Sequence, residues 1–462
     1  MGEETRMQEN RMKNSLMDTF ESKLMPIAKY ISTNKYLMAI RDGFLVSMPL
    51  LVVGSIFMLI SNFPVQAWIN LLSNTNIAGT SISSYFSNIT NATFSIMAIF
   101  VVIGIGYNYA KEEKVSPIFG AAVAILSWFI LMPFTTEYIP EGSSTAIEVA
   151  SIPLQWVGSK GIFIGIFCAF ISVRIYKWVE DKNWTIKMPS GVPPTVGQSF
   201  AALFPIAMVI IVFFLIRVLF SLTSWGNAFD FVYKILQMPL QKVGDTLGAM
   251  LGIYLFAHIL WFFGIHGTNI TDSVFRPILY ALSAENLAAL QAGNPLPHII
   301  NSQFQDLFAT YGGGGSTLSL LIIMLFFCKS KRIKQLGKLA IVPGIFEINE
   351  PIIFGLPIVL NPIMAVPFIL TPMVNILISY ITMRIGIVPI CNGVIMPWTT
   401  PPIISGFLSS GWQGAVLQIF LIALGALIYY PFIKVVDKQY LKDESEDSDS
   451  GTDDFSLDDL SL

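Results

Sequence analysis

Long apolar runs recur along the whole chain, and they constrain its fold more than any other feature. A helix of about 20 apolar residues spans the hydrocarbon core of a bilayer. Only 12% of the residues are charged, about half the share in soluble domains. Lipid must therefore surround much of the surface, and the sequence predicts an all-α polytopic membrane protein. The clear runs lie at 42–61, 93–110, 116–134, 158–178, 199–222, 246–264, 314–328, 361–384 and 412–433.

The distribution of Lys and Arg residues predicts the orientation of the chain, because cytoplasmic loops are enriched in them. The loop 62–92 has no charged residue, whereas the run 314–328 is followed by the densest basic cluster of the chain. That cluster would lie outside the cell unless another helix crosses between 265 and 313, and the segment 273–290 is the best candidate. We therefore expect about ten transmembrane helices, with both termini in the cytoplasm. The segment before the first run carries the basic residues Lys23, Lys29, Lys35 and Arg41.

The segment 224–245 predicts a division of the chain into two halves. Apolar and aromatic residues alternate there with Asn227, Asp230, Lys234 and Gln237, which is typical of an amphipathic helix in the membrane interface. The acidic, low-complexity end of the chain predicts a solvated tail. The expected order is a cytoplasmic segment at 1–35, an amino-terminal membrane half of five helices at 36–223, the linker helix at 224–245, a carboxy-terminal membrane half at 246–440 and an acidic disordered tail at 441–462.

Two apolar stretches in the second half contain too many prolines for ordinary membrane helices. The stretch 340–360 holds three prolines, and the stretch 386–408 holds four. Proline removes a backbone donor and clashes with the preceding turn, and lipid does not supply a replacement partner. We predict two re-entrant hairpins, which often form the substrate site of a transporter. The alternative is that proline kinks two packed helices, which is less plausible for the second stretch.

A few ionisable residues in these segments are candidate functional residues, because burying a charge in lipid is costly. His266 lies between two glycines, where backbone can approach a ligand closely, and its imidazole can bond a hydroxyl group. Asn349 and Glu350 precede Pro351, which disfavours helical backbone at Glu350 and suits the tip of a hairpin. A carboxylate at such a tip can accept hydrogen bonds from two sugar hydroxyls.

Other polar residues have structural explanations that compete with a functional one. We expect His258 and His298 to be satisfied packing residues, and Glu347 to pair with a Lys or Arg at the interface. Trp398 lies at the tip of the second predicted hairpin. Its ring can pack on the apolar face of a sugar, or it can belong to an interfacial aromatic belt. Its position alone leaves both readings open.

The sequence offers no pattern for a metal, a cofactor or a nucleic acid. Cys168, Cys328 and Cys391 lie far apart, without CxxC or Cys/His spacing, and predict thiols packed inside a helical bundle. The glycine run 312–315 lacks the GK[ST] of a phosphate loop and could extend the short run that follows it. The sequence has no cluster of basic residues of the kind that is typical of nucleic-acid-binding proteins. We therefore expect no cofactor, and a small polar solute as the ligand.

Four motifs together resemble one known family. They are AIRDGF at 39–44, GIHGTN at 264–269, NEPIIFGLPIVLNP at 349–362 and MPWTTPP at 396–402. With them the chain resembles enzyme IIC, the membrane component of the bacterial phosphoenolpyruvate-dependent sugar phosphotransferase system, in its lactose/cellobiose/diacetylchitobiose branch. The resemblance implies a protein of the bacterial cell membrane with ten transmembrane helices and two re-entrant hairpins. It also implies a homodimer formed by the amino-terminal half and a disaccharide site in the carboxy-terminal half.

The resemblance assigns roles to the candidate residues and names the partners. His266 and Glu350 would hold hydroxyls near the phosphorylated position, Trp398 would lie against a sugar ring, and Asn349 is a weaker assignment. Either His266 or Glu350 could take the hydroxyl proton as the catalytic base. The phosphoryl donor would be a cysteine of a separate IIB protein, itself supplied through IIA, HPr and enzyme I. The three cysteines of this chain would then carry no phosphate.

The expected function is translocation of a sugar with concomitant phosphorylation. The resemblance implies a fused IIB domain in lactose-type members. Because no soluble domain follows the last apolar run of this sequence, we expect cellobiose or diacetylchitobiose rather than lactose. One rival is a proton-coupled secondary transporter, in which Glu350 and His266 would form a proton relay. A second rival is a membrane receptor that does not transport its ligand.

Overall fold

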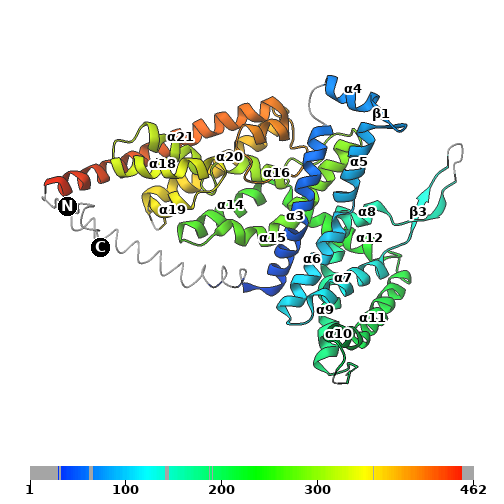
Figure 1. Ribbon diagram of the computed structural model, residues 1–462. Helices are drawn as coiled ribbons and strands as arrows, with labels where there is room; N and C mark the ends of the chain where they lie inside the picture. Colours follow the sequence, from blue (N-terminus) through cyan, green and yellow to red (C-terminus); the bar gives the residue numbers. More distant parts are fainter. Residues whose placement is uncertain are drawn as a thin grey trace. The chain divides into compact units, whose positions relative to one another are not determined.

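The computed structural model describes residues 26, 30, 33–61, 66–140, 145–186, 188–189, 191–356, 358–359 and 361–449. Their regular structure is almost entirely helical (Figure 1), which confirms the predicted all-α class. Two short antiparallel ladders complete it in this part of the chain: β1 (Asn76–Ile77) pairs with β2 (Thr80–Ser81), and β3 (Thr135–Tyr138) pairs with β4 (Ile147–Ala150).

The chain forms two compact units. Unit 1 comprises Met1–Thr246, Asn269–Ser302 and Asn392–Ile395, and unit 2 comprises Leu247–Thr268, Gln303–Cys391 and Met396–Leu462. The first boundary falls at the end of the predicted linker segment. Residues 269–302 group with unit 1, although the sequence had placed them in the second half.

Unit 1 is built on a bundle in which α6 packs on α3, α7 and α9, and α11 packs on α7 and α9. Close helix approach depends on small residues: a Cβ added at Gly106 would lie 2.7 Å from the carbonyl oxygen of Gly120. At the end of α6, the Glu113 carboxylate accepts hydrogen bonds from Lys35 and Arg174 and so joins three helices. The bundle helices are α3 (Lys35–Ser61), α6 (Met97–Glu112), α7 (Pro117–Leu131), α9 (Ile162–Asp181) and α11 (Leu203–Ser221).

Shorter elements complete unit 1, and the predicted linker is one of them. The linker is helical throughout most of its length, with a π-helical turn in its middle. These elements are α4 (Gln66–Asn74), α5 (Ile82–Thr93), α8 (Leu154–Val157), η2 (Ser159–Gly161), α10 (Pro194–Ala201), α12 (Ala228–Val232), η3 (Tyr233–Gln237) and α13 (Met238–Gly244).

The segment 273–290, expected to hold the hidden crossing, lies within the continuous helix α15 (Gly267–Gln291). This helix begins at the last residues of one unit 2 segment and continues through unit 1. The sequence therefore located a long helix correctly, although too many polar residues lie in it for hydropathy alone to find it.

Unit 2 holds the remaining helices. Within it α14 packs on α20, α17 packs on α18 and α21, and α20 packs on α21. The three cysteines, which are distributed over both units, are buried free thiols, as the sequence predicted. The helices are α14 (Leu247–Phe262), α16 (Ser302–Phe304, which starts at the end of unit 1), η4 (Gln305–Ala309, a π-helical turn), α17 (Thr317–Phe326), α18 (Lys331–Ile345), α19 (Glu350–Gly355), α20 (Pro362–Arg384) and α21 (Ile404–Asp449).

Among the described residues, six helices are long and apolar enough to cross a membrane, or seven if one bent pair counts as a single span. That pair, Ala228–Gly244 and Leu247–Phe262, is bent by 73°. Two shorter apolar helices, Pro117–Leu131 and Thr317–Phe326, coincide with predicted crossings. The expected total of ten transmembrane helices stays a prediction.

The stretch 340–360 forms a helical hairpin. The chain leaves α18, turns through residues 346–349 and enters α19, which packs back on α18 (Figure 1). A Cβ added at Gly355, the last residue of α19, would lie 2.5 Å from Leu336 in the middle of α18, so the two arms run side by side. Pro357 lies outside the described residues. Whether this hairpin dips into the membrane stays a prediction.

The stretch 386–408 differs from the hairpin that we expected. Residues 385–403 have no regular secondary structure, and α21 begins at Ile404 and is interrupted at Ser410 and Gly411. The four prolines explain the missing helix, because each removes a backbone donor. Backbone N–H groups of this segment instead donate hydrogen bonds to side chains.

The acidic tail also differs in part from the expectation of disorder. Residues 441–449 continue α21 as helix. The Glu444 carboxylate accepts hydrogen bonds from the hydroxyl of Ser330 and the backbone N–H of Arg332, at the start of α18. Carboxylates stabilise a helix amino terminus, so this contact gives the end of α21 a partner. Residues 450–462 lie outside the described residues.

Candidate functional site

The glycine run 312–315 is the centre of the candidate site in unit 2. Gly312, Gly313 and Gly315 all have φ between 74° and 81°, a left-handed conformation that residues with a Cβ rarely adopt. The run therefore does not extend α17, a possibility that the sequence had left open. It forms a loop whose backbone groups bond to side chains from three other segments of unit 2.

The tip of the first hairpin bonds directly to this loop. The N–H of Gly313 donates to Oε2 of Glu347 over 2.8 Å, and Nδ2 of Asn349 donates to the carbonyl oxygen of Gly314 over 2.7 Å. Glu347 and Asn349 are both buried. The expected pairing of Glu347 with a Lys or Arg is wrong, because backbone N–H serves this carboxylate instead.

Glu350 follows these two anchors and differs from them in exposure. It is the first residue of α19, and its side chain is exposed. The hairpin tip is thus fixed by Glu347 and Asn349, while the neighbouring Glu350 carboxylate remains available to a ligand.

His258 supports the same loop from α14. Its Nε2 accepts a hydrogen bond of 3.0 Å from the N–H of Gly315, and its Nδ1 lies 2.7 Å from the carbonyl oxygen of Tyr254. Nδ1 must therefore carry the proton and donate. The carbonyl oxygen of Gly315 accepts from the hydroxyl of Tyr429 over 2.6 Å. The prediction that His258 is a satisfied packing residue agrees with these contacts.

His266 lies just beyond the end of α14, in the turn before α15. Its side chain is exposed. Its ring lies 4.2 Å, centroid to centroid, from the ring of buried Trp261, and its Nδ1 lies 3.1 Å from the hydroxyl of Thr268. The backbone there approaches closely, since a Cβ added at Gly267 would lie 1.9 Å from the carbonyl oxygen of Ala257.

Trp261 connects His266 to the hairpin tip. A Cβ added at Gly314 would lie 3.2 Å from the indole nitrogen of Trp261, and the carbonyl oxygen of Gly314 accepts from Asn349. Thus a continuous path of contacts runs from His266 through Trp261 and Gly314 to Asn349, the neighbour of Glu350.

Trp398 lies in the irregular segment of the same unit, and 46% of its surface is exposed. Two glutamines hold this segment in place. Oε1 of Gln303 accepts from the N–H of Met396 over 3.1 Å. Oε1 of Gln418 accepts from the N–H of Ile403 over 2.5 Å, and its Nε2 donates to the carbonyl oxygen of Leu307 over 2.7 Å. The path of contacts from His266 to Asn349 does not include Trp398.

All four predicted site residues, His266, Asn349, Glu350 and Trp398, fall in unit 2. The sequence did not identify the supporting role of the glycine loop, of Trp261 or of the two glutamines. Four successive glycines were a usable signal, because such a run is expected where backbone must adopt left-handed φ.

The exposed side chains supply groups that suit an uncharged polar ligand. Glu350 offers an acceptor of charge-assisted hydrogen bonds, and the imidazole of His266 can donate or accept. The exposed indole of Trp398 offers an apolar ring face. Such groups beside a helical hairpin and an irregular segment, in a chain with several apolar helices of spanning length, are typical of integral membrane permeases.

The comparisons with known proteins identify the family within this class. The family model "Phosphotransferase system, EIIC" matches residues 41–372, and the chain belongs to this family of sugar permeases. It is 43% identical to the oligo-β-mannoside-specific EIIC component of Bacillus subtilis, over 92% of this chain and 94% of that one. It is 39% identical to the cellobiose-specific EIIC component of Geobacillus stearothermophilus, over 93% and 97% of the two chains.

A solved structure is similar over the same length. The crystal structure of ChbC, the IIC component of the N,N'-diacetylchitobiose-specific phosphotransferase system, matches with a TM-score of 0.88 and 39% identity, covering 92% of this chain and 99% of that one. The resemblance read from the four sequence motifs is thereby confirmed. The chain is an integral, multi-pass membrane permease of the EIIC family.

Proposed function

We propose that the chain binds a β-linked disaccharide of the cellobiose or diacetylchitobiose type and carries it across the bacterial cell membrane while a separate, phosphorylated IIB protein phosphorylates it. Membership of the EIIC family carries this proposal. The relatives named for oligo-β-mannosides, cellobiose and diacetylchitobiose support the substrate class, since all of these are sugars joined by β-linkages.

In this proposal Glu350 and His266 bind sugar hydroxyls. The exposure of both side chains beside a rigidly bonded loop supports the assignment. Asn349 acts mainly through its bond to Gly314, which fixes the tip that carries Glu350. Trp398 supplies an aromatic face for a sugar ring, and its exposure supports this role over burial in the bundle.

The phosphoryl transfer has a simple balance of bonds. The phosphorus–sulfur bond on the cysteine of IIB breaks, a phosphorus–oxygen bond forms on the sugar hydroxyl, and the hydroxyl proton moves to Glu350 or His266 as the base. This chain supplies the bound sugar and the base, and IIB supplies the phosphoryl group. Some relatives are named EIICB, which supports a direct partnership between the two components.

Two further parts of the proposal concern assembly. We propose a homodimer formed through the amino-terminal half, with both termini in the cytoplasm, where IIB and, upstream of it, IIA, HPr and enzyme I are found. The basic residues after α17 support this orientation, because such clusters are typical of cytoplasmic loops. The family membership does not favour the proton-coupled transporter or the receptor.

The substrate is tested by a binding screen with detergent-purified protein. Cellobiose, diacetylchitobiose, mannobiose and lactose are titrated, with the α-linked disaccharide maltose as the control. We expect saturable binding of at least one of the first three and none of maltose. Preference for maltose, or for a charged solute, would reject the proposed substrate class.

A further inference from the structure

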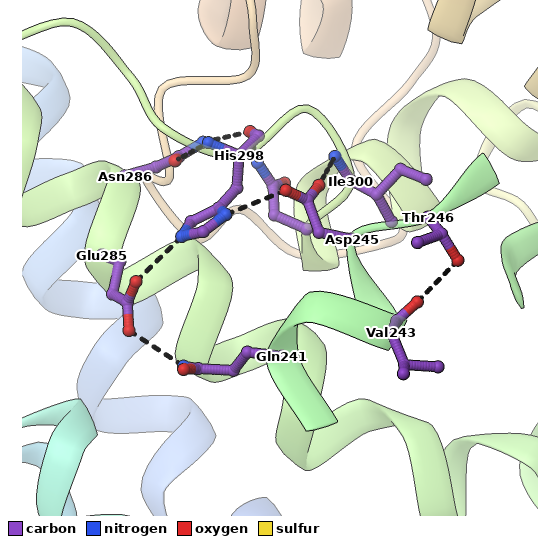
Figure 2. Close-up of polar contacts among 9 residues, drawn as sticks. Gln241, Val243, Asp245, Thr246, Glu285, Asn286, His298 and Ile300 are labelled. Atoms are coloured by element: carbon purple, nitrogen blue, oxygen red, sulfur yellow. Dashed lines mark hydrogen bonds and ion pairs between the residues drawn. The ribbon is translucent and has the colours of Figure 1, made fainter. Parts of the chain in front are cut away.

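A second cluster of charged side chains lies in unit 1, outside the candidate sugar site (Figure 2). Its centre is His298, in the loop that follows α15. Nδ1 of His298 lies 3.0 Å from Oδ2 of Asp245, and Nε2 lies 2.8 Å from Oε2 of Glu285. Carboxylate oxygens accept hydrogen bonds, so both ring nitrogens must donate, and the ring is an imidazolium held between two carboxylates.

The remaining atoms of the two carboxylates are also engaged. Oδ1 of Asp245 accepts from the backbone N–H of Ile300 over 3.1 Å, and Oε1 of Glu285 accepts from Nε2 of Gln241 over 2.9 Å. Figure 2 shows these contacts converging from α13, from α15 and from the loop. The carboxylates therefore join three segments, and each bond is charge-assisted.

The backbone of His298 is fixed as well as its ring. Asn286 of α15 accepts from its N–H over 2.9 Å and donates to its carbonyl oxygen over 2.7 Å. Hydrogen bonds therefore fix both the backbone and the side chain of His298 in this loop. The side chains of the three charged residues are only 18–25% exposed, which strengthens their attraction relative to a surface ion pair.

The place of this cluster in the chain is its most informative property. Asp245 stands immediately before the boundary where the chain passes from unit 1, ending at Thr246, into unit 2, beginning at Leu247. Ile300 stands just before a second boundary, between Ser302 and Gln303. The cluster thus binds together, on the unit 1 side, two separate segments that continue into unit 2.

Both segments lead to the candidate sugar site. The first continues as α14, which carries Trp261 and ends just before His266. The second continues through η4 to the glycine loop 312–315, which holds the tip beside Glu350. If unit 2 changes its conformation during transport, the backbone must rotate after Asp245 and after Ile300, because the hydrogen bonds of the cluster fix where each segment leaves unit 1.

We propose that Asp245, Glu285 and His298 are positioning residues for translocation, which hold the two segments leading into the sugar site at one fixed anchor in unit 1. The inference rests on the proposed function, since it assigns the cluster to the transport step of that same site. None of the three residues touches the sugar in this account. Their removal should therefore slow transport without weakening binding.

The test compares His298→Gln with Lys177→Gln in proteoliposomes. Lys177 also pairs with a carboxylate in unit 1, that of Asp181 on α9, over 3.3 Å, and it serves as the matched control. The equilibrium affinity for labelled cellobiose and the rate at which vesicles containing phosphorylated IIB accumulate its phosphate are both measured. We expect His298→Gln to lower the rate about tenfold, the factor that a charge-assisted hydrogen bond is worth, while the affinity changes less than about twofold.

Asp245→Asn provides a second, milder variant in case His298→Gln does not fold. The two changes should be non-additive, so that the double variant is no slower than His298→Gln alone. An unchanged rate of sugar-phosphate accumulation in both single variants, or parallel losses of affinity and rate, would overturn the proposal. Parallel losses would mean that the cluster only stabilises the fold.

Hydrogen exchange gives a readout that needs no sugar. We expect His298→Gln to raise amide exchange together in the segments 243–249 and 298–304, with exchange in α9 unchanged. A failure of the wild-type protein to bind any β-linked disaccharide would reject the proposed function. Coupled exchange of the two segments would still support the anchor, whereas exchange in only one segment would overturn it.

Discussion

The side-chain amide of Asn349 donates a hydrogen bond of 2.7 Å to the carbonyl oxygen of Gly314. This contact joins the tip of the α18–α19 hairpin to a left-handed glycine loop 35 residues away in sequence. Together with the bond between Gly313 and Glu347, it fixes the position from which Glu350 projects. The site therefore depends on backbone geometry in the loop as much as on the residues that would bind the sugar.

Gly313→Ala tests this dependence. Gly313 has φ of 81°, and an added Cβ would lie 2.7 Å from Cγ of Asn349. We expect the affinity for cellobiose to fall at least tenfold, because left-handed backbone costs about 1–2 kcal/mol for an L-residue and the hairpin tip must shift. Isothermal titration measures the effect. Gly197→Ala is the control, since a Cβ there meets open space; equal affinities in the two variants would contradict the prediction.

Glu350→Gln and His266→Ala test the binding groups themselves. We expect each change to lower sugar affinity at least tenfold, because bonds to charged groups are worth about 1.5–3 kcal/mol. The protein should still assemble, since both side chains are exposed. Affinity is measured by titration and assembly by size-exclusion chromatography. Glu137→Gln, an exposed carboxylate on β3, is the control, and near-normal affinity in both site variants would show that the pocket lies elsewhere.

Glu347→Ala should act on stability rather than on binding chemistry. Its carboxylate is buried and accepts from the N–H of Gly313, so its removal leaves that N–H without this partner. The expected cost is about 1–3 kcal/mol, seen as a lower melting temperature in a thermal unfolding assay. Glu350→Ala should leave the melting temperature nearly unchanged. The account is contradicted if Glu350→Ala is the more destabilising of the two.

The cluster of Asp245, Glu285 and His298 predicts that the stability of the folded protein depends on pH. Burial acts to lower the pKa of His298, but the bonds to Asp245 and Glu285 raise it, to about 9 in total. A histidine in the unfolded chain has a pKa near 6.5. The cluster therefore contributes its full stabilisation of the fold below about pH 6.5 and loses it as the pH rises through about 9. Of the other titratable groups nearby, Tyr233 has a pKa raised by burial and by the charge of Glu285, and Lys160 lines a cavity with Glu285.

The measurement is the melting temperature between pH 6 and pH 10 for the wild type and for His298→Gln. The wild type should lose stability relative to the variant across the upper part of this range. A constant difference between the two melting temperatures over the whole range would show that the charge of His298 contributes nothing.

Much of the fold follows from the sequence alone, because helix formation in lipid depends on local composition. The apolar runs match α3, α6, α7, α9, α11, α14, α17 and α20, and the polar segment 273–290 was correctly expected to be a helix. The sequence predicted the hairpin at 340–360, but Glu350, which Pro351 was expected to keep out of helix, is the first residue of α19, and the turn lies at 346–349.

The remaining features depend on contacts between distant residues. Glu347 is bonded to Gly313, and His298 to Asp245, through pairings that lie 34 and 53 residues apart. No local pattern selects such partners. The prolines of the segment 385–403 indicated broken helix, but we expected a hairpin there and not an irregular segment. Its support by Gln303 and Gln418 could not be predicted, because isolated glutamines carry no positional signal.

The grouping of residues 269–302 with unit 1 could not be read from the sequence for the same reason. Chain order places this segment after the linker, and only its tertiary contacts assign it to the first unit. Those contacts include the ring of Tyr280 stacked at 5.5 Å on that of Phe44.

The central claim is that the sugar leaves the site as its phosphate. The most direct measurement is the chemical form of labelled cellobiose, or of whichever β-linked disaccharide binds best, inside vesicles that contain this protein and phosphorylated IIB. We predict that the label accumulates as sugar phosphate, at a rate that uncouplers do not change. Accumulation of free sugar that stops when a proton gradient is collapsed would contradict the account.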